Sequence, residues 1–137
     1  MKTETLYDIF CQHPEVTTDS RRVPEGSMFF ALKGESFDGN RFAAKALEAG
    51  AAAVVVDDAA VVPDGDDRYL LVDDVLKALQ DLAAYHRQQF HGPVVQVTGT
   101  NGKTTTKELI AAVLSERFNV LYTQGNLNNH IGVPLTL

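Results

Sequence analysis

Short apolar runs alternate with amphipathic stretches along the whole chain, and this alternation limits the possible folds more than any other feature. The apolar runs predict strands at 28–32, 52–56, 69–72, 94–97 and 120–122. The amphipathic stretches predict helices at 4–12, 41–49, 75–90 and 103–118, and the first turn of another at 133–137. Strands that alternate with helices predict an α/β fold.

One boundary divides this pattern. His91-Gly92-Pro93 ends the predicted helix before it, because proline cannot continue a helix and glycine frees the backbone. We therefore expect one unit at residues 1–91 and a second at residues 92–137. The length of 137 residues supports one full domain, or one small domain plus part of another.

Composition narrows the function classes. With 45% hydrophobic and 22% charged residues the chain should fold as an ordinary globular protein. Twelve Lys and Arg against eighteen Asp and Glu give a net charge of -6, so no basic stripe exists to neutralise a nucleic acid. Any phosphate that the chain binds must be held locally.

Two observations indicate in which cellular compartment the protein works. The single cysteine, Cys11, cannot form an intramolecular disulfide, and no signal-peptide pattern opens the chain. The longest strongly apolar run, residues 51–56, is far shorter than the ~20 residues that span a bilayer. We expect a cytoplasmic protein without membrane insertion.

The loop between the strand expected at 94–97 and the following helix carries the chemistry. It reads Gly99-Thr100-Asn101-Gly102-Lys103-Thr104-Thr105. Glycines let backbone N–H groups turn toward phosphate oxygens, and the helix adds its positive end. Lys103 would reach the β- and γ-phosphates of ATP, and the Thr104 hydroxyl would bind Mg²⁺. The loop is shorter than a full Walker A pattern, because Val97 occupies the position of its first glycine.

The alternative interpretation of this loop is a plain strand-to-helix turn with a solvated Lys103. A lysine in the first turn of a helix opposes the macrodipole unless an anion compensates it. The phosphate-binding interpretation is therefore preferred.

Longer stretches around this loop resemble the Mur ligases, the amide-forming enzymes of peptidoglycan precursor synthesis. The resemblance rests on residues 97–108, on Gln124-Gly125-Asn126-Leu127-Asn128-Asn129-His130 with 131–137, and on Thr18-Asp19-Ser20-Arg21 with 26–34 and Phe37-Asp38-Gly39. It covers essentially the whole chain. In one position the chain departs from many relatives, which have histidine where Asn40 stands.

The resemblance implies a fold and a reaction. Residues 1–91 would be the N-terminal domain that holds the UDP end of the substrate, and residues 92–137 the opening β-loop-α-β of the central P-loop ATPase domain. The reaction would be the ATP-dependent addition of D-Ala-D-Ala to UDP-N-acetylmuramoyl-tripeptide through an acyl phosphate. Lys103 and Thr104 would be catalytic, Gly99–Thr105 would bind ATP, and Thr105 would hydrogen bond an α-phosphate.

The resemblance also implies substrate contacts. Ser20 and Arg21 would bind uridine and diphosphate, since a hydroxyl and a guanidinium fork both bond phosphate oxygens. Asn128, Asn129 and His130 would face the muramoyl or carboxylate end. The alternatives are a turn capped by Asp19 and Ser20, asparagines that merely form a loop, and a structural histidine.

Three further alternatives stay open: another Mur ligase (MurE-like), a different P-loop enzyme such as a small kinase, and a non-catalytic UDP-sugar-binding module. The chain is shorter than a complete Mur ligase, so we expect a fragment without ligase activity of its own. The Mg²⁺ ligands beyond Thr104 and the site of the amine substrate would lie past Leu137. An unfinished central sheet leaves an open edge, which predicts self-association through residues 94–137.

Overall fold

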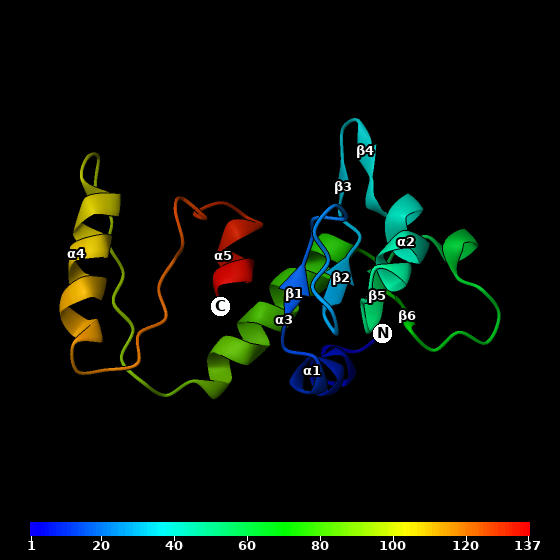
Figure 1. Cartoon of the computed structure of the whole chain (residues 1–137), viewed down its shortest axis with the longest axis horizontal. Helices are drawn as coiled ribbons and strands as arrows, with labels where there is room; N and C mark the ends of the chain where they lie inside the picture. Colours follow the sequence, from blue (N-terminus) through cyan, green and yellow to red (C-terminus); the bar gives the residue numbers. More distant parts are fainter.

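The computed structural model describes residues 1–137 and places the first three predicted strands in one parallel sheet (Figure 1). In the order in which they pair, its strands are β1 (Val16–Thr17), β2 (Met28–Phe30), β5 (Ala53–Val56) and β6 (Tyr69–Leu71). Met28 lies opposite Ala53, and Val56 lies opposite Leu71. β2 and β5 are buried along their whole length, as expected for inner strands covered on both faces.

Two apolar clusters cover the two faces of this sheet. Met28 and Phe30 pack with residues of α1 (Thr3–Gln12) and α3 (Val75–Gln89), whereas Phe29 packs with α2 (Ala43–Glu48). Successive side chains of a strand point to opposite faces, which explains the division. Phe29 and Phe30 are both 0% exposed, and burying each contributes roughly 1.5–3 kcal/mol.

The helix starts follow the local sequence. α3 begins after Asp74, whose carboxylate accepts a hydrogen bond from the Lys77 N–H at 2.8 Å and so caps the helix. α2 begins two residues after the predicted start at Arg41, because a 3₁₀ turn, η1 (Gly39–Phe42), precedes it.

Several short elements were not predicted. They are β1, the antiparallel hairpin β3 (Lys33–Gly34) with β4 (Phe37–Asp38), η1, and the 3₁₀ turn η2 (Ala59–Val61). Each is too short to produce a periodic signal. At Gly39 the chain approaches itself closely, since a Cβ there would lie 2.5 Å from the Leu32 carbonyl oxygen.

Beyond α3 the structure contains two helices, α4 (Lys103–Ser115) and α5 (Gly132–Thr136), and both were predicted. The strands predicted at 94–97 and 120–122 are wrong, because neither segment pairs with another strand. A strand is held by hydrogen bonds to a neighbour, and here none is present. Their apolar side chains are therefore exposed, Val95 by 62% and Leu121 by 79%.

α4 stands apart from the sheet, whereas α5 lies against α3 (Figure 1). The C-terminal helix of the second predicted unit thus packs on the last helix of the first. The division at residues 91 and 92 stays a prediction, although residues 90–102 contain no helix or strand. None of the helices is both long and apolar enough to cross a membrane.

Candidate functional site: the loop before α4 and the segment beside it

Two glycines shape the loop that precedes α4. Gly99 has a φ angle of 150° and Gly102 one of 74°, and residues that have a Cβ rarely adopt either value. Gly102 is the N-cap residue of α4, and no side chain caps this end of the helix. The first N–H groups of α4 therefore remain available to an anion.

Lys103 is the first residue of α4, and its ammonium folds back over the loop. Its Nζ donates a hydrogen bond to the Gly99 carbonyl oxygen at 2.5 Å. A cation at this end of a helix is unfavourable by itself, because the macrodipole is positive there. A bound anion would remove this conflict, so the ammonium and the free N–H groups are the candidate anion site.

Thr104 connects this site to a distant part of the chain. Its hydroxyl donates a hydrogen bond to the Asn126 Oδ1 at 2.9 Å. Lys107, one turn further along α4, donates from Nζ to the carbonyl oxygens of Thr123 at 2.5 Å and Gly125 at 3.0 Å. Asn126 is thus a site residue that the sequence reasoning missed, although it lies in the motif Gln124–His130. The other predicted loop residues, Thr100, Asn101 and Thr105, are exposed.

The three substrate residues predicted after Asn126 have different surroundings. The Asn129 Oδ1 accepts hydrogen bonds from the N–H groups of Gly132 at 2.7 Å and Ile131 at 3.1 Å, so it caps the start of α5. This supports the alternative interpretation of Asn129 as a structural residue. Asn128 and His130 are exposed, and the His130 carbonyl oxygen accepts a hydrogen bond from Gln80.

Ser20 and Arg21 lie in a turn that follows β1. Asp19 accepts hydrogen bonds from the backbone N–H and the guanidinium of Arg21, the latter through Nε and NH2 at 2.9 Å each. These bonds lower the pKa of Asp19 to about 2, and the same pair raises the pKa of Arg21. The Arg21 side chain is nevertheless 86% exposed. No hydrogen bond or ion pair joins this turn to the loop at 99–105.

The same turn occurs elsewhere in the chain. Asp66 accepts hydrogen bonds from the N–H, Nε and NH2 of Arg68 in the same pattern. The geometry around Arg21 therefore recurs in a second Asp-x-Arg turn of this chain. It leaves the phosphate-binding role of Arg21 as a prediction and provides a matched control for it.

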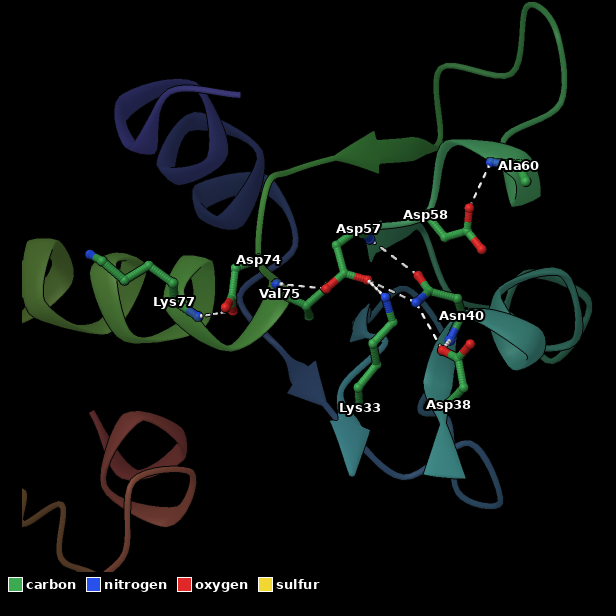
Figure 2. A network of polar contacts seen from close by, with 9 residues as sticks. All are labelled: Lys33, Asp38, Asn40, Asp57, Asp58, Ala60, Asp74, Val75 and Lys77. Carbon is green, nitrogen blue, oxygen red and sulfur yellow. Dashed lines mark hydrogen bonds and ion pairs between the residues drawn. The ribbon is translucent and has the colours of Figure 1, made fainter. Parts of the chain in front are cut away.

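A polar network lies where β5 ends, and it shows what the asparagine at position 40 does (Figure 2). The Asn40 side chain is buried, and its Nδ2 donates to the Asp38 Oδ1 at 2.9 Å and the Asp57 Oδ1 at 2.8 Å. Its Oδ1 accepts a hydrogen bond from the Asp57 N–H at 3.1 Å. Asp57 also pairs with the Lys33 Nζ at 2.7 Å. With its carboxamide used in this way, Asn40 holds the hairpin and the sheet together rather than facing a ligand.

The network sets the charge of its carboxylates. Burial raises the pKa of Asp57, but hydrogen bonds from Lys33, Asn40 and the Val75 N–H outweigh it and hold that pKa below its usual value. Hydrogen bonds from Asn40 likewise lower the pKa of Asp38. Both groups are therefore charged at neutral pH, and this edge of the sheet is acidic. It is a poor site for a diphosphate.

Comparison with known protein families matches both parts of the chain. Residues 14–87 match the family described as "Mur ligase family, catalytic domain", and residues 97–137 match "Mur ligase middle domain".

Two curated relatives have the same name. The UDP-N-acetylmuramoyl-tripeptide--D-alanyl-D-alanine ligase of Bacillus subtilis (strain 168) is 49% identical over 122 residues, which are 89% of this chain and 27% of that protein. The ligase of the same name from Escherichia coli (strain K12) is 50% identical over 122 residues, 89% of this chain and 26% of that protein. The chain thus spans about a quarter of the length of the curated relatives it matches.

Solved structures agree with the sequence comparison. The crystal structure of MurF ligase from Thermotoga maritima in complex with ADP has a TM-score of 0.76 and 37% identity, covering 99% of this chain and 30% of that one. A crystal structure of MurF from Acinetobacter baumannii has a TM-score of 0.79 and 35% identity, covering 98% of this chain and 32% of that one.

Proposed function

The chain belongs to the Mur ligase family, and from this we propose that it forms the first part of an ATP-dependent ligase that adds D-Ala-D-Ala to UDP-N-acetylmuramoyl-tripeptide. Such a reaction builds a peptidoglycan precursor. The single observation that carries the proposal is that Lys103 and uncapped N–H groups lie together at the start of α4.

In this proposal the loop binds the terminal phosphates of ATP. The relative from Thermotoga maritima, which was solved with ADP, supports nucleotide binding. The tripeptide carboxylate attacks the γ-phosphorus, ADP leaves, and the amine of D-Ala-D-Ala then displaces phosphate from the acyl phosphate to form the amide. Charge on the transferring group is stabilised by the Lys103 ammonium and the N–H groups of α4.

Mg²⁺ fits the residues beside the loop. The Thr104 hydroxyl and the Asn126 carboxamide oxygen lie 2.9 Å apart, and both are the hard oxygen donors that Mg²⁺ prefers. We infer that this pair holds the ion when nucleotide is bound. Bound Mg²⁺ would neutralise phosphate charge, and these two residues would orient it.

The N-terminal unit would hold the UDP end of the substrate, with Ser20 and Arg21 at the diphosphate. The exposure of Arg21 and its fork of donors support this role. Asn128 and His130 would face the muramoyl end. The division of the chain into a substrate unit at 1–91 and a nucleotide unit at 92–137 is part of the same proposal.

Calorimetry of the chain with two ligands, UDP-N-acetylmuramoyl-tripeptide and Mg-ATP, tests the proposal. Binding of both supports it. A chain that binds the UDP compound alone would be a UDP-sugar-binding module, and one that binds Mg-ATP alone would be a different P-loop enzyme. A MurE-like ligase would favour the UDP-muramoyl dipeptide over the tripeptide.

Matched variants make this test specific. Lys103→Ala should abolish Mg-ATP binding, whereas Lys77→Ala, which removes the same charge from an exposed ion pair on α3, should leave it unchanged. Arg21→Ala should weaken binding of the UDP compound, and Arg68→Ala should not. If both variants of a pair behave alike, the role assigned to Lys103 or Arg21 is wrong.

We also expect no ligase turnover from these residues alone, because the chain spans about a quarter of its relatives' length. The assay supplies Mg-ATP, UDP-N-acetylmuramoyl-tripeptide and D-Ala-D-Ala and measures phosphate release. Turnover by the purified chain would contradict this expectation.

A further inference from the structure

The contact between α3 and α5 joins the sheet unit to the segment carrying the nucleotide loop without following the chain. We propose that Gln80 of α3 and Leu135 of α5 position the loop at 99–105 relative to the N-terminal unit. The proposal rests on the proposed function for its purpose, namely to bring nucleotide and UDP-substrate to a fixed separation. How the position is transmitted follows from a series of contacts between α4, the segment 123–136 and α3.

The first contacts clamp the start of α4 to the segment 123–126. The Thr104 hydroxyl bonds the Asn126 side chain, and the Lys107 ammonium bonds the carbonyl oxygens of Thr123 and Gly125. Lys107 is largely shielded, with 18% of its side chain exposed, and its Nζ lies 5.7 Å from the centre of the Tyr122 ring. The start of α4 therefore moves with this segment.

The next contacts make residues 126–136 one piece. The Asn128 N–H donates to the Asn126 carbonyl oxygen at 2.7 Å, and Asn129 caps α5. Gly132 is packed so closely that a Cβ there would lie 2.7 Å from the Leu127 Cα. A displacement of α5 is thus transmitted to Asn126 and from there to Thr104.

The last contacts attach α5 to the N-terminal unit (Figure 1). Leu135 packs against the apolar cluster that contains Leu79 and Leu82 of α3. Gln80 donates from Nε2 to the His130 carbonyl oxygen at 3.0 Å, across fifty positions of sequence.

The apolar part of this contact is incompletely packed. A groove of about 340 Å³ runs beside it, lined by residues of α1, α3 and α5 that include Phe10, Leu82 and Pro134. Loose apolar packing allows one helix to slide on another, whereas a hydrogen bond has a required direction and length. We therefore infer that the Gln80 hydrogen bond sets the register of α5 on α3. Leu135 supplies the attraction between the two helices.

The stretch of chain that connects α3 to α4 cannot fix the position of the loop relative to the sheet unit. Residues 90–102 form no helix or strand, and no backbone hydrogen bond involves the stretch 94–98. Without the α3–α5 contact, α4 and its loop would be tethered to the sheet unit by an extended connector alone. The connector would permit a wide range of separations.

The test measures this separation directly. Cys11, the single and exposed cysteine, takes one spin label on α1, and Ala112→Cys on the exposed side of α4 takes the second. Double electron–electron resonance then reports the distribution of distances between α1 and α4. With the labelled chain diluted in an excess of unlabelled chain, so that only pairs within one molecule are counted, the parent chain should give one narrow distribution.

Variants separate positioning from simple destabilisation. Gln80→Ala and Leu135→Ala should broaden the distribution, and Gln80→Lys, which keeps a donor, should restore it. Gln89→Ala is the matched control, because the Gln89 side chain bonds only the Tyr85 carbonyl oxygen of its own helix, and it should change nothing. The thermal midpoint of the sheet unit should be the same in parent and Gln80→Ala.

A broad distribution in the parent chain, or Gln80→Ala and Leu135→Ala distributions as narrow as the parent's, would overturn the proposal. Failure of Gln80→Lys to restore the narrow distribution would overturn the role of the donor. The measurement uses no nucleotide and no UDP compound. A chain that bound neither ligand would therefore refute the proposed function and leave this result standing.

Discussion

Asn40 shows how much one buried polar side chain can organise. Its carboxamide bonds Asp38, which ends the β3–β4 hairpin, and Asp57, which follows β5. Because the side chain is 2% exposed, its loss would remove one donor from Asp38 and one from Asp57 in a place that water reaches poorly.

Substitutions at Asn40 should therefore be costly. Asn40→Leu should lower the free energy of unfolding by about 2–3 kcal/mol, because Asp57 and Asp38 lose charge-assisted bonds. Asn40→Asp should be destabilising at pH 7 and much less so in acid, because it places a third carboxylate beside two others. Urea unfolding at both pH values measures this. Equal stability of Asn40→Leu and the parent would show that the network is dispensable.

Asp57 should make the stability of the folded chain depend on pH in the acid range. Its folded pKa is lowered, so its contribution is complete above its unfolded pKa of about 3.9 and is lost as the pH falls through the lower folded value. The thermal midpoint of the parent should therefore drop between about pH 5 and about pH 3 more steeply than that of Asp57→Asn. Asp64→Asn, at an exposed carboxyl without a bonding partner, is the control and should follow the parent.

α3 and α4 illustrate two ways in which a helix is held. α3 has an aspartate cap and a buried stripe of Val75, Leu79 and Leu82, so both local sequence and packing stabilise it. α4 begins at a glycine without a side-chain cap, and its apolar residues Leu109 and Val113 are 62% and 72% exposed. Packing supports most helices in proteins, so α4 should be the weaker of the two.

The cap of α3 can be tested by itself. Asp74→Ala should lower the free energy of unfolding by about 1 kcal/mol, because the Lys77 N–H loses its acceptor at the positive end of the helix. Asp73→Ala removes a neighbouring exposed carboxylate that caps nothing. Thermal unfolding followed by circular dichroism should separate the two variants, and an equal loss in both would point to charge rather than to capping.

Taken together, the apolar residues divide the molecule into two regions. The sheet and the helices that cover it bury most of their apolar side chains. In contrast, the apolar side chains on the exposed face of α4 and those of Val94, Val95, Phe118 and Leu121 are in contact with water. An apolar surface spread over one region is characteristic of a surface that another chain or segment covers.

This surface should make the chain associate with itself. Light scattering should give a mass that rises with concentration, because pairing would bury the exposed residues of 94–137. Leu109→Lys with Val113→Lys should keep the chain monomeric. Phe37→Lys, at an exposed apolar residue of the β3–β4 hairpin, is the control and should still associate. A parent chain that remains monomeric at millimolar concentration would contradict the expectation.

The positions of most helices and of the inner strands could be read from local pattern, because the apolar spacing, the Asp74 cap and the glycines at 99 and 102 act over a few neighbouring residues. The same reasoning predicted strands at 94–97 and 120–122, where the structure has unpaired segments. A strand needs hydrogen bonds from a neighbour, and no local pattern reports whether the neighbour is present.

Tertiary contacts likewise decided which partners several polar side chains have. Lys103 and Thr104 stand out in the sequence because their neighbours are glycines at a characteristic spacing. Asn126, Gln80 and Asn40 acquire their partners across 22, 50 and 17 positions of chain. Such partners are chosen by how elements pack, so their identity depends on the fold as a whole and leaves no signal in the residues beside them.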